Sequence, residues 1–568
     1  MSSLTPTVRP SLKVPKENNR FLCWPNANDS KQLLNRNQAI FNQRSLPKWF
    51  RQLRSQAREH ALSLSKEYLL EYAPTLGQSI SFAEMDNKQL VVGGHQPELF
   101  HPGVWFKNFL LSEISKRTNS VGLQVIIDHD VARSDSLRVP TCSNTKVAER
   151  SAIGFSQRSI LLPIQRESHT RQPWHATVAG PQSQVAWNKT VLDVGQTISA
   201  CGLAQPLLVS RDSMLQECIL GTKNIGDAFS RFRHTIEMEN GVFNLEVPIG
   251  QLCAGTAFGL FVLHCVRNAE SLWEAYNGCR EAYRKRHKIR NQAQPVLELQ
   301  KRDDWLELPF WIYRLDSGSS VDRKRLWVRK QNHHMLLCDH VEANLRTVSV
   351  ELPLNEHELS KHWKAIHQSG ICIRPRALMT TMYLRCFVAD LFVHGIGGGT
   401  YDELTDDIIR HWFGIDPPEY LTSSASLHLP FGLNSNAKQI DPSVSWHAIQ
   451  RELHLIRSAP ERFLDLSNDS QRELSESHSF QLANIPERGK KLQWHKEISQ
   501  IKARIEAAIE PKRQAAVSNL EAIQAETQQI KILKSREYSF VLFEEQDAVG
   551  RLKKLAKAAF SQDADAGK

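Results

Sequence analysis

Residues 90–108 read LVVGGHQPELFHPGVWFKN, and this stretch decides the fold class that the sequence predicts. Its first residues, Leu90-Val91-Val92, form a short apolar run that stops at two glycines, which is typical of a buried strand. After a polar loop, the apolar positions of residues 104–116 suit a helix packed on a sheet, with Pro102 in its first turn. Another apolar segment, residues 123–127, predicts a second strand. Strand, helix and strand at this spacing form a βαβ unit, so the sequence predicts an α/β fold with a parallel sheet.

A second stretch of the same design lies far along the chain. The apolar run Leu391-Phe392-Val393 is followed by HGIGGGTYDE, residues 394–403. Three successive glycines are entropically costly and seldom serve packing alone, so they favour a loop whose backbone cradles a phosphate or carboxylate. The helix expected after them, YDELTDDIIRHWFG, has acidic residues in its first turn and a glycine stop at Gly414.

Polar side chains also follow the strand predicted at 123–127, as Asp128-His129-Asp130. Open α/β sheets bind ligands at the carboxyl ends of their strands, where helix N-termini favour anions. We therefore expect GGHQPELFHPG, the Asp-His-Asp segment and HGIGGG to meet in one crevice. Imidazoles can bind an anionic group or exchange protons at neutral pH, and carboxylates can orient an amine or hold Mg²⁺. The expected catalytic residues are His95, His101, Asp128, His129 and Asp130.

The glycines and the remaining polar groups of these loops are expected to bind a cofactor: Gly93, Gly94, Lys107, His394, Gly395, Gly397, Gly398 and Gly399. The alternative for the first loop is a structural turn with a hydrogen-bonded histidine. A structural or catalytic metal site is a further alternative, for which the suitable ligand types are His95, His101, Asp128, His129, Asp130 and His394. No pair of them has the i, i+4 spacing of a helical zinc motif, and no metal ligand is assigned. A serine hydrolase is disfavoured because the GxSxG elbow is missing from the sequence.

These blocks resemble those of the bacillithiol-biosynthesis cysteine-adding family, the BshC-type cysteine ligases. That family opens its core with a GQQ-x-G-LF-x-GP-type loop, and GGHQPELFHPGVWFKN is similar. Its EDHD-type strand end is similar to residues 127–130. Its later block runs from an RP pair to a Gly-rich GPGE-type turn and a tyrosine, as Arg374-Pro375 through HGIGGGTYDE does here. His95 stands where the family has Gln and Gly399 near its Glu, so the chain resembles a divergent member.

The resemblance implies a Rossmann-like parallel-sheet core, an inserted α+β connecting region and a C-terminal coiled-coil helical region. It adds Gln96, Arg374 and Tyr401 to the cofactor-binding residues. It also implies thiol biosynthesis and a ligase that joins an amino acid or amine to a small polar acceptor, including a sugar-derived one. Amide formation in water needs an activated carboxyl group, so ATP or ADP with Mg²⁺ is the expected cofactor, although no Walker A motif is present.

Two other functions remain open. The GHQP segment is also similar to the HQPxYxPW loop of the WbqC-like family, which favours a nucleotidyltransferase-like enzyme. A non-catalytic scaffold that binds a nucleotide or metabolite is the alternative from another class. Whether His95, His129 and His394 meet in one pocket is the observation that separates an enzyme from a scaffold.

Changes in composition and hydrophobic pattern along the chain suggest five segments. They are a tail and helical region (1–85, with a helix at Leu46–Tyr72), a first core part (86–215), an inserted domain (216–370), a second core part (371–485) and a coiled coil (486–568). The inserted domain contains a predicted hairpin of PFWIYRL and RLWVRK, and residues 376–389 predict a helix. In the last segment, Ile498, Ile501, Ile505 and Ala508 follow the spacing of a coiled-coil seam, and Pro511 is expected to break or kink it into a hairpin or bent pair. We expect a homodimer through this coiled coil.

Bulk composition limits the other partners. The 568 residues include 41% hydrophobic and 23% charged residues, which is typical of a soluble protein. The net charge of +10 is spread along the chain without a nucleic-acid module, so nucleic-acid binding is disfavoured. Residues 254–266 are too short for a membrane span, and no apolar export segment follows the first basic residues. Ten scattered cysteines without a CxxC pair suggest a reducing, cytoplasmic location.

Overall fold

The computed structural model describes residues 10–75, 85, 87–132, 135–147, 150–165, 172–179, 183–291, 296–315, 321–332, 334–353, 356–431 and 442–561. The chain divides into two compact units. Unit 1 comprises Met1–Val139, Arg158–Leu429 and Arg536–Lys568, and unit 2 comprises Pro140–Gln157 and Pro430–Ser535. This division is based on contacts in space, whereas the five predicted segments are based on composition and hydrophobic pattern along the sequence.

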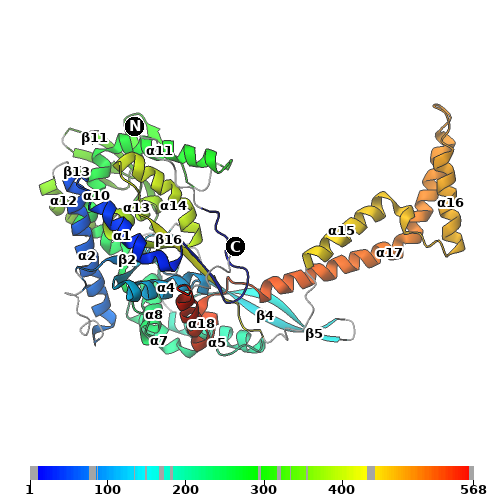
Figure 1. Cartoon of the computed structure of the whole chain (residues 1–568), viewed down its shortest axis with the longest axis horizontal. Coiled ribbons are helices and arrows are strands. Elements are labelled where there is room, and N and C mark those ends of the chain that lie inside the picture. Colours follow the sequence, from blue (N-terminus) through cyan, green and yellow to red (C-terminus); the bar gives the residue numbers. More distant parts are fainter. Residues whose placement is uncertain are drawn as a thin grey trace. The chain divides into compact units, whose positions relative to one another are not determined.

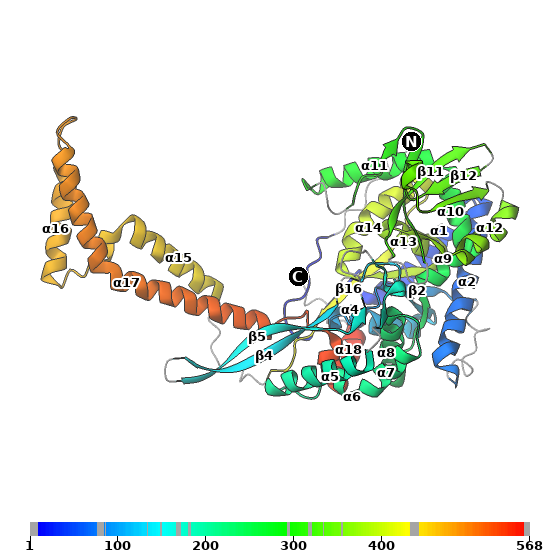
Figure 2. The ribbon, with the colours of Figure 1, turned by 180° about the vertical axis from the view of Figure 1, so that it is seen from behind.

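A six-stranded, mainly parallel sheet forms the centre of unit 1 (Figures 1 and 2). Its strands, in spatial order, are β1 (Arg20–Trp24), β16 (Tyr420–Ser426), β15 (Leu391–His394), β2 (Leu90–His95), β3 (Val121–Ile126) and β8 (Leu245–Pro248). All neighbours pair in parallel except β1 and β16. Strands β3, β8, β15 and β16 are buried along their whole length, as expected when helices cover both faces of a parallel sheet. The predicted α/β class with a parallel sheet is confirmed.

The strand order reverses between β2 and β15. From β2 the chain proceeds outward through β3 to β8, and from β15 it proceeds in the other direction to β16. The central pairs keep a simple register, with Phe392 opposite Val92 and Val92 opposite Leu123. Such a reversal leaves a crevice at the carboxyl ends of the two strands, because the following helices diverge to opposite faces.

Helix α4 (Pro102–Thr118) connects β2 with β3, and its limits follow from its termini. His101 is the N-cap and Pro102 takes the first helical position, where its missing N–H costs no hydrogen bond. Asn119 ends the helix in the left-handed conformation, with φ 53°. The predicted helix at 104–116 is confirmed and is slightly longer than expected.

Helix α14 (Ile396–Ile408) connects β15 with β16 and corrects two expectations. Its first turn contains no acidic residue, because the helix begins at Ile396 and Asp402 and Glu403 lie in its second turn. The glycines predicted to form a loop, residues 397–399, lie inside its first turn. Two of them are required by packing, since a Cβ on Gly398 would lie 2.9 Å from His394 Nδ1 and a Cβ on Gly399 would lie 2.5 Å from Thr422 Oγ1. A π-helical turn, Ile409–Phe413, extends α14 and ends at Gly414, with φ 69°, so the predicted glycine stop is confirmed.

Helices α13 and α14 lie on one face of the central sheet, and α4 and α18 lie on the other (Figures 1 and 2). Helix α13 (Ala377–Tyr383) continues as a π-helical turn, Leu384–Val388, which confirms the helix expected at 376–389. The other helices of four or more residues in the described part of unit 1 are α1 (Ser30–Phe41), α2 (Lys48–Tyr72), α5 (Ser183–Ala200), α6 (Leu207–Ser210), α7 (Asp212–Leu220), α8 (Ile225–Glu239), α9 (Ile249–Ala254), α10 (Thr256–Arg267), α11 (Ala269–Arg286), α12 (Glu356–Gln368) and α18 (Glu545–Ala558).

A second, antiparallel sheet completes unit 1. Its order is β13 (Ser349–Pro353), β12 (His334–Cys338), β11 (Lys324–Gln331), β10 (Trp305–Arg314) and β14 (Ile371–Pro375), with β9 (Lys301–Arg302) also paired to β10. The predicted hairpin is confirmed as β10 and β11. One apolar core runs from the central sheet through α10 to this second sheet, with Phe258, Phe310 and Trp363 among its members. Two short strands, β6 (Ile164–Gln165) and β7 (Val178–Ala179), pair separately.

Unit 2 is built mainly from helices α15 (Pro442–Ser458), α16 (Asp469–Ala483) and α17 (Leu492–Leu533). A two-stranded ribbon pairs β4 (Ser136–Val147) with β5 (Arg150–Leu161), and its residues 140–157 also belong to unit 2. The helices share a small core made of Ile456, Leu464, Leu474, Ile505, Ile509 and Ala516. Ile498 is also buried, whereas Ile501 and Ala508 are half-buried.

Pro511 does not end α17, so the expected break within 486–537 is wrong, whereas the alternative of a kink agrees with the bend that α17 shows part-way along its length (Figures 1 and 2). The helix runs through it for 42 residues. The φ of proline is compatible with a helix, and the loss of one N–H bond is offset where neighbouring helices pack on both sides of the site. Helices α15 and α16 contact α17, and Lys512 Nζ donates to Phe463 O (2.7 Å) close to the proline. The hairpin instead forms between α16 and α17.

The chain after α17 belongs to unit 1. Phe540 N donates to Phe100 O (2.8 Å), and Leu207 N donates to Phe543 O (2.7 Å). Helix α18 then packs against α4, and Arg211 holds Glu545 through two hydrogen bonds (2.6 and 2.8 Å). Residues 536–558, expected to be part of the coiled coil, are thus part of the body of unit 1. Among the described residues, no helix is both long and apolar enough to cross a membrane.

Candidate functional site

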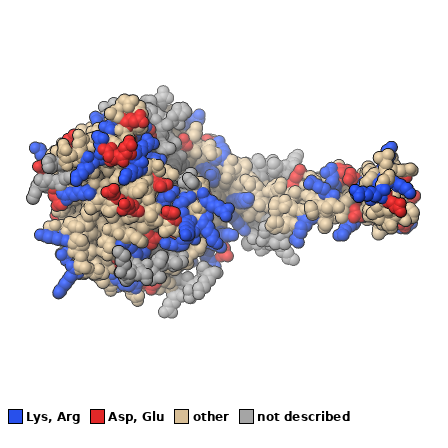
Figure 3. Space-filling view, turned by 90° about the horizontal axis from the view of Figure 1, so that it is seen from above, with Lys and Arg blue, Asp and Glu red and all other residues tan. Residues whose placement is uncertain are grey.

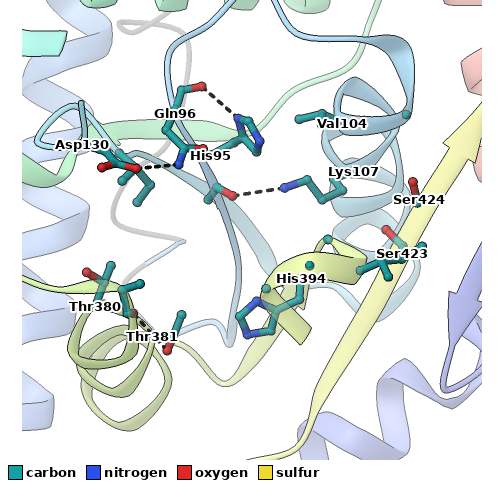
Figure 4. A pocket seen from close by; sticks show the side chains of 18 of the residues that line it. His95, Gln96, Val104, Lys107, Asp130, Thr380, Thr381, His394, Ser423 and Ser424 are labelled. Carbon is teal, nitrogen blue, oxygen red and sulfur yellow. Dashed lines mark hydrogen bonds between the residues drawn. The ribbon is translucent and has the colours of Figure 1, made fainter. Parts of the chain in front are cut away.

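A cavity of about 510 Å³ lies at the carboxyl ends of the strands where the strand order reverses. The loop after β2, the end of β15, the start of α14 and strand β16 contribute to its lining (Figure 4). The structure brings most of the expected site residues together here: Gly94, His95, Gln96, His101, Lys107, His129, Asp130, His394, Gly395, Gly397 and Gly398. The three histidines that were to separate an enzyme from a scaffold, His95, His129 and His394, all line this one cavity.

Five expected residues do not line the cavity: Gly93, Asp128, Arg374, Gly399 and Tyr401. A Cβ on Gly93 would lie 2.7 Å from Gln124 Oε1, so that glycine serves the sheet. Asp128 Oδ1 accepts a hydrogen bond from Gly250 N (2.9 Å), and Arg374 is buried with donor bonds to His367 and Ile373. Tyr401 is 42% exposed. Of these five residues, only Asp128 comes from the polar segment after a strand, and the Gly250 N–H holds its side chain outside the cavity.

His95 is neutral and presents one unprotonated nitrogen. Its Nδ1 lies 3.0 Å from Gln96 O, and a carbonyl oxygen only accepts, so Nδ1 carries the proton and Nε2 is the acceptor. Burial, followed by the charge of Lys107, lowers the pKa of His95 to about 3. The ring also stands edge-on to Phe100, with centroids 5.1 Å apart.

His101 has a local structural role. As the N-cap of α4, its Nδ1 accepts a hydrogen bond from Gly103 N (3.1 Å). Burial and the charge of Arg536 lower the pKa of His101 to about 3, so the ring is neutral and Nε2 carries the proton. Val104 N and Trp105 N both donate to His101 O, so the N-terminus of α4 is largely closed to ligands.

His129 and Asp130 are held by their neighbours. Gln96 Nε2 donates to Asp130 Oδ2 (2.9 Å), and Arg323 donates to His129 O (2.7 Å) and to Asp130 Oδ1 (3.2 Å). Burial by itself would raise the pKa of Asp130, but the Gln96 hydrogen bond and Arg323 lower it overall. Burial lowers the pKa of His129 to about 3, and its Nδ1 has no hydrogen-bond partner in the described part of the chain.

Lys107 lies one turn into α4, and its ammonium points toward the carbonyl oxygen of Gly94 in β2 (Figure 4). It is 5% exposed, and burial lowers its pKa to about 8. Its Nζ donates to Gly94 O (3.1 Å) and is 3.9 Å from where a Cβ on Gly395 would lie. Within the described residues, no carboxylate forms an ion pair with it.

The N-terminus of α14 is open. Its N-cap, Gly395, has no side chain to cap it, and the first intrahelical bond runs from Gly399 N to Gly395 O (2.9 Å). The N–H groups of Ile396, Gly397 and Gly398 therefore have no intrahelical acceptor. These groups, the helix dipole and the ammonium of Lys107 together form an anion-binding arrangement.

His394 and Asp402 form a buried pair beside this arrangement. His394 Nε2 lies 2.8 Å from Asp402 Oδ2. Asp402 also accepts from Arg385 Nη1 (2.6 Å) and Thr381 Oγ1 (2.6 Å). Burial would raise the pKa of Asp402, but Arg385 and then His394 lower it well below its usual range. Burial lowers the pKa of His394 even though Asp402 opposes this shift.

The cavity also contains residues that the sequence did not suggest: Thr380, Thr381, Arg323, Ser423, Ser424, Arg536 and Glu537. Arg536 Nη2 donates to Ser424 Oγ (3.1 Å), and its Nε lies 3.4 Å from Glu537 Oε1. In the described structure, Arg536 Nη1 and the buried hydroxyl of Ser423 have no hydrogen-bond partner. No sequence motif surrounds Arg536. Its place in the cavity is evident only from the structure, in which the segment after α17 is part of unit 1.

Charge elsewhere on the surface is mixed. Lys and Arg side chains lie among Asp and Glu on much of the face shown in Figure 3, and they predominate on one part of it. In the basic run at 284–290, Arg286 pairs with Asp407 (3.0 Å), and Arg284 donates to Asn291 O (2.6 Å). This run therefore contributes to local ion pairs and hydrogen bonds.

A buried acidic cluster, His234, Glu237 and Glu246, has ligand atoms within 4.8 Å of one another. Arg233 donates to both carboxylates (2.8 and 2.5 Å), and the two nitrogens of His234 face Tyr72 Oη and Asn244 O. This cluster is accordingly an internal ion-pair network.

Compared with known proteins, the chain matches no family model, and no curated protein matches its sequence.

Proposed function

We propose that this protein is a BshC-like ligase with a Rossmann-like core. It joins an amino acid or amine to a small polar acceptor and holds an anionic group of a substrate at the start of α14. The observation that carries the proposal is the buried ammonium of Lys107 beside the open N-terminus of α14. The reversal of strand order at this point supports the Rossmann-like description.

The energetics favour an anion at this position. Burying an ammonium without a carboxylate partner costs free energy, because the charge loses its hydration. The same loss lowers the pKa of Lys107. A phosphate or carboxylate would accept from Lys107 Nζ and, at the same time, from the first N–H groups of α14, which have no acceptor among the described residues. The flanking histidines are neutral, so they add hydrogen bonds without adding charge. A nucleotide phosphate or an acyl phosphate has suitable chemistry.

The residues fit a phosphate better than they fit Mg²⁺. Both carboxylate oxygens of Asp130 already accept hydrogen bonds, and Asp128 faces Gly250. These two residues are therefore poor candidates for holding the metal, and we assign no step to it. A nucleotide would supply the activation of a carboxyl group, and the residues of this chain would bind its phosphate.

The alternatives are a nucleotidyltransferase-like enzyme and a binding scaffold. The His394–Asp402 pair favours an enzyme, because a carboxylate that orients an imidazole inside a cavity is a common catalytic arrangement. Nucleotidyl transfer would use the same anion-binding groups, and the choice of nucleotide distinguishes it from ligation.

Isothermal titration of ATP, ADP, CTP and inorganic phosphate tests the anion site. We expect binding to the wild-type protein and at least about tenfold weaker binding to Lys107→Met, since a charged hydrogen bond contributes roughly 1.5–3 kcal/mol. Lys116→Met is the matched control, because this exposed lysine lies on the same helix outside the cavity. Absence of binding by any of the four ligands at millimolar concentration would contradict the proposal.

The proposal includes a homodimer through the helices of unit 2, forming a coiled coil, and a cytoplasmic role in thiol biosynthesis. Support for the dimer comes from large apolar side chains exposed where α16 ends and α17 begins. They are Phe480, Leu482, Ile485 and Leu492, between 48% and 79% exposed. Apolar side chains gathered in this way mark interaction surfaces more often than single ones do.

A further inference from the structure

We infer that His394 is the base that removes a proton from the attacking nucleophile, and that Asp402 positions it. This inference rests on the proposed function, because it concerns a reaction at the anion held by α14. His394 is the last residue of β15, and Asp402 lies in the second turn of α14. The helix start that binds the anion and the pair that moves the proton are therefore parts of one strand–helix junction.

The hydrogen bonds fix which nitrogen is the base. Asp402 accepts hydrogen bonds from Arg385 and Thr381, which keeps it an ionised acceptor. The proton between Asp402 and His394 consequently resides on Nε2, which leaves Nδ1 with a free lone pair. No hydrogen bond to His394 Nδ1 occurs among the described residues, and His394 lines the cavity.

Gly398 leaves the space in front of this nitrogen open. A Cβ at this position would lie 2.9 Å from His394 Nδ1, closer than a normal contact. Glycine lowers the stability of a helix relative to alanine, by roughly 0.5–1 kcal/mol at an interior position. Access to Nδ1 gives a physical reason for that cost. A Cβ on the neighbouring Gly397 would have no described atom within 4 Å, so the requirement is specific to Gly398.

The charges around the ring suit a proton acceptor that stays neutral until the reaction. Lys107 from α4 and Arg385 from the π-helical turn after α13 are the cations that lower its pKa, and Asp402 is the anion that raises it. The remaining ring contacts, Phe392 and Tyr420, come from β15 and β16. Asp402 would stabilise the imidazolium when it forms.

The step balances as follows for an acyl phosphate formed from a nucleoside triphosphate. The amine nitrogen attacks the carbonyl carbon, so a C–N bond forms while the C–O bond to phosphate breaks. The phosphate leaves with the bonding electron pair and stays at α14 beside Lys107. The proton released by the amine passes to His394 Nδ1 and from there to the departing phosphate. No oxidant or reductant is needed.

Diethyl pyrocarbonate tests the base without a known substrate. An unprotonated imidazole nitrogen attacks its carbonyl carbon, forming an N–C bond and releasing ethanol and carbon dioxide. Peptide mass spectrometry then measures the modification rate of His394. Because burial lowers the pKa of His394, we expect this rate to persist at pH 6, where N-acetylhistidine, with a pKa near about 6.5, is already slowed.

Gly398→Ala should slow modification of His394 at least about tenfold, because the added methyl group covers Nδ1. Gly278→Ala is the matched control, since Gly278 lies in helix α11, where an added Cβ would have no described atom within 4 Å. Thermal unfolding of both variants verifies that they fold. An unreactive His394 in the wild-type protein, or equal rates in wild type and Gly398→Ala, would overturn the inference.

Failure of the proposed function gives a different result. One outcome is that His394 is reactive and Gly398→Ala slows its modification, but no nucleotide or phosphate binds. That result would support His394 as an accessible base and would contradict the proposed anion site. If phosphate binds and slows modification of His394, both stand. If phosphate binds and His394 is unreactive without it, the anion site stands and the base falls.

Discussion

At the scale of single residues, the cavity combines buried neutral histidines with the buried ammonium of Lys107. Histidines with lowered pKa values supply hydrogen bonds, and Lys107 supplies a charge without a carboxylate partner among the described residues. Asp128 illustrates the opposite case, a carboxyl group held in the structure away from the cavity. Burial raises its pKa to about 6, although Arg374 opposes the shift.

This shift predicts a pH dependence of stability. A carboxyl group with a raised folded-state pKa contributes stability that is fully present below about pH 4 and is lost as pH rises through about 6. Asp128→Asn keeps an oxygen that can accept from Gly250 N but removes the titration. Relative to wild type, the variant should therefore gain up to about 3 kcal/mol between pH 4 and pH 8.

Urea unfolding at pH 4 and pH 8 measures the free energy of unfolding that this prediction requires. Asp416→Asn is the control, because Asp416 is exposed in unit 1, and it should follow wild type at both pH values. A variant that is less stable than wild type at pH 8 would show that the charged form of Asp128 is stabilised, with Arg374 as its partner.

At the scale of elements, α14 and α17 departed most from expectation. In α14, two glycines allow close approach to His394 and Thr422, so the helix begins earlier than the composition suggested. In α17, packing by α15 and α16 compensates for the missing hydrogen bond of Pro511. Tertiary packing overrode local propensity in both elements.

The exposed end of the α16–α17 hairpin predicts an effect on assembly. Leu492 is 79% exposed in the single chain. If it is buried in a homodimer, Leu492→Glu removes about 1.5–3 kcal/mol at each of two symmetric positions and should raise the dimer Kd roughly 100-fold or more. Leu220→Glu, 69% exposed on α7 of unit 1, is the matched control.

Sedimentation equilibrium at micromolar concentration distinguishes the outcomes. We expect a dimer for wild type and Leu220→Glu and a monomer for Leu492→Glu. A monomeric wild-type chain would exclude this dimer, and a dimer unaffected by Leu492→Glu would move the interface away from the hairpin.

At the scale of the whole molecule, segments that are far apart in the sequence pack into the same unit: unit 1 is made of three separate stretches of the chain. The segment after α17 brings Arg536 to the cavity and buries a group of apolar side chains in unit 1. Its large members with at most 1% exposure are Tyr538, Phe540, Val541, Leu542, Phe543 and Leu552. Removal of residues 486–568 would therefore remove part of the buried core of unit 1 together with α17.

Truncation after Ser535 should prevent cooperative folding of unit 1. Each large apolar side chain contributes roughly 1.5–3 kcal/mol when buried, so the loss of these six is comparable with the about 5–15 kcal/mol that stabilises a typical domain. Thermal unfolding followed by near-ultraviolet circular dichroism measures the result. Truncation after Ser561 retains every described residue and is the control. An unchanged melting transition for the shorter chain would contradict the prediction.

The sequence by itself determined the parallel sheet and the meeting of its polar strand ends. Apolar runs that stop at Gly93 and at His394 are local patterns, and the carboxyl ends of parallel strands must share one edge of a sheet. The helix start at Pro102 and the stop at Gly414 were equally local, because they depend on the φ of one residue. These features needed no long-range contact.

Only the tertiary structure decided which side chains face the cavity. Asp128 and His129 are adjacent, yet His129 lines the cavity and Asp128 turns to Gly250, because the helix that begins at Ile249 offers it a backbone donor. Arg536 and Ser423 are more than a hundred residues apart and meet only after the helices of unit 2 have returned the chain to unit 1. A side chain's direction depends on partners far away in sequence, and no local pattern records them.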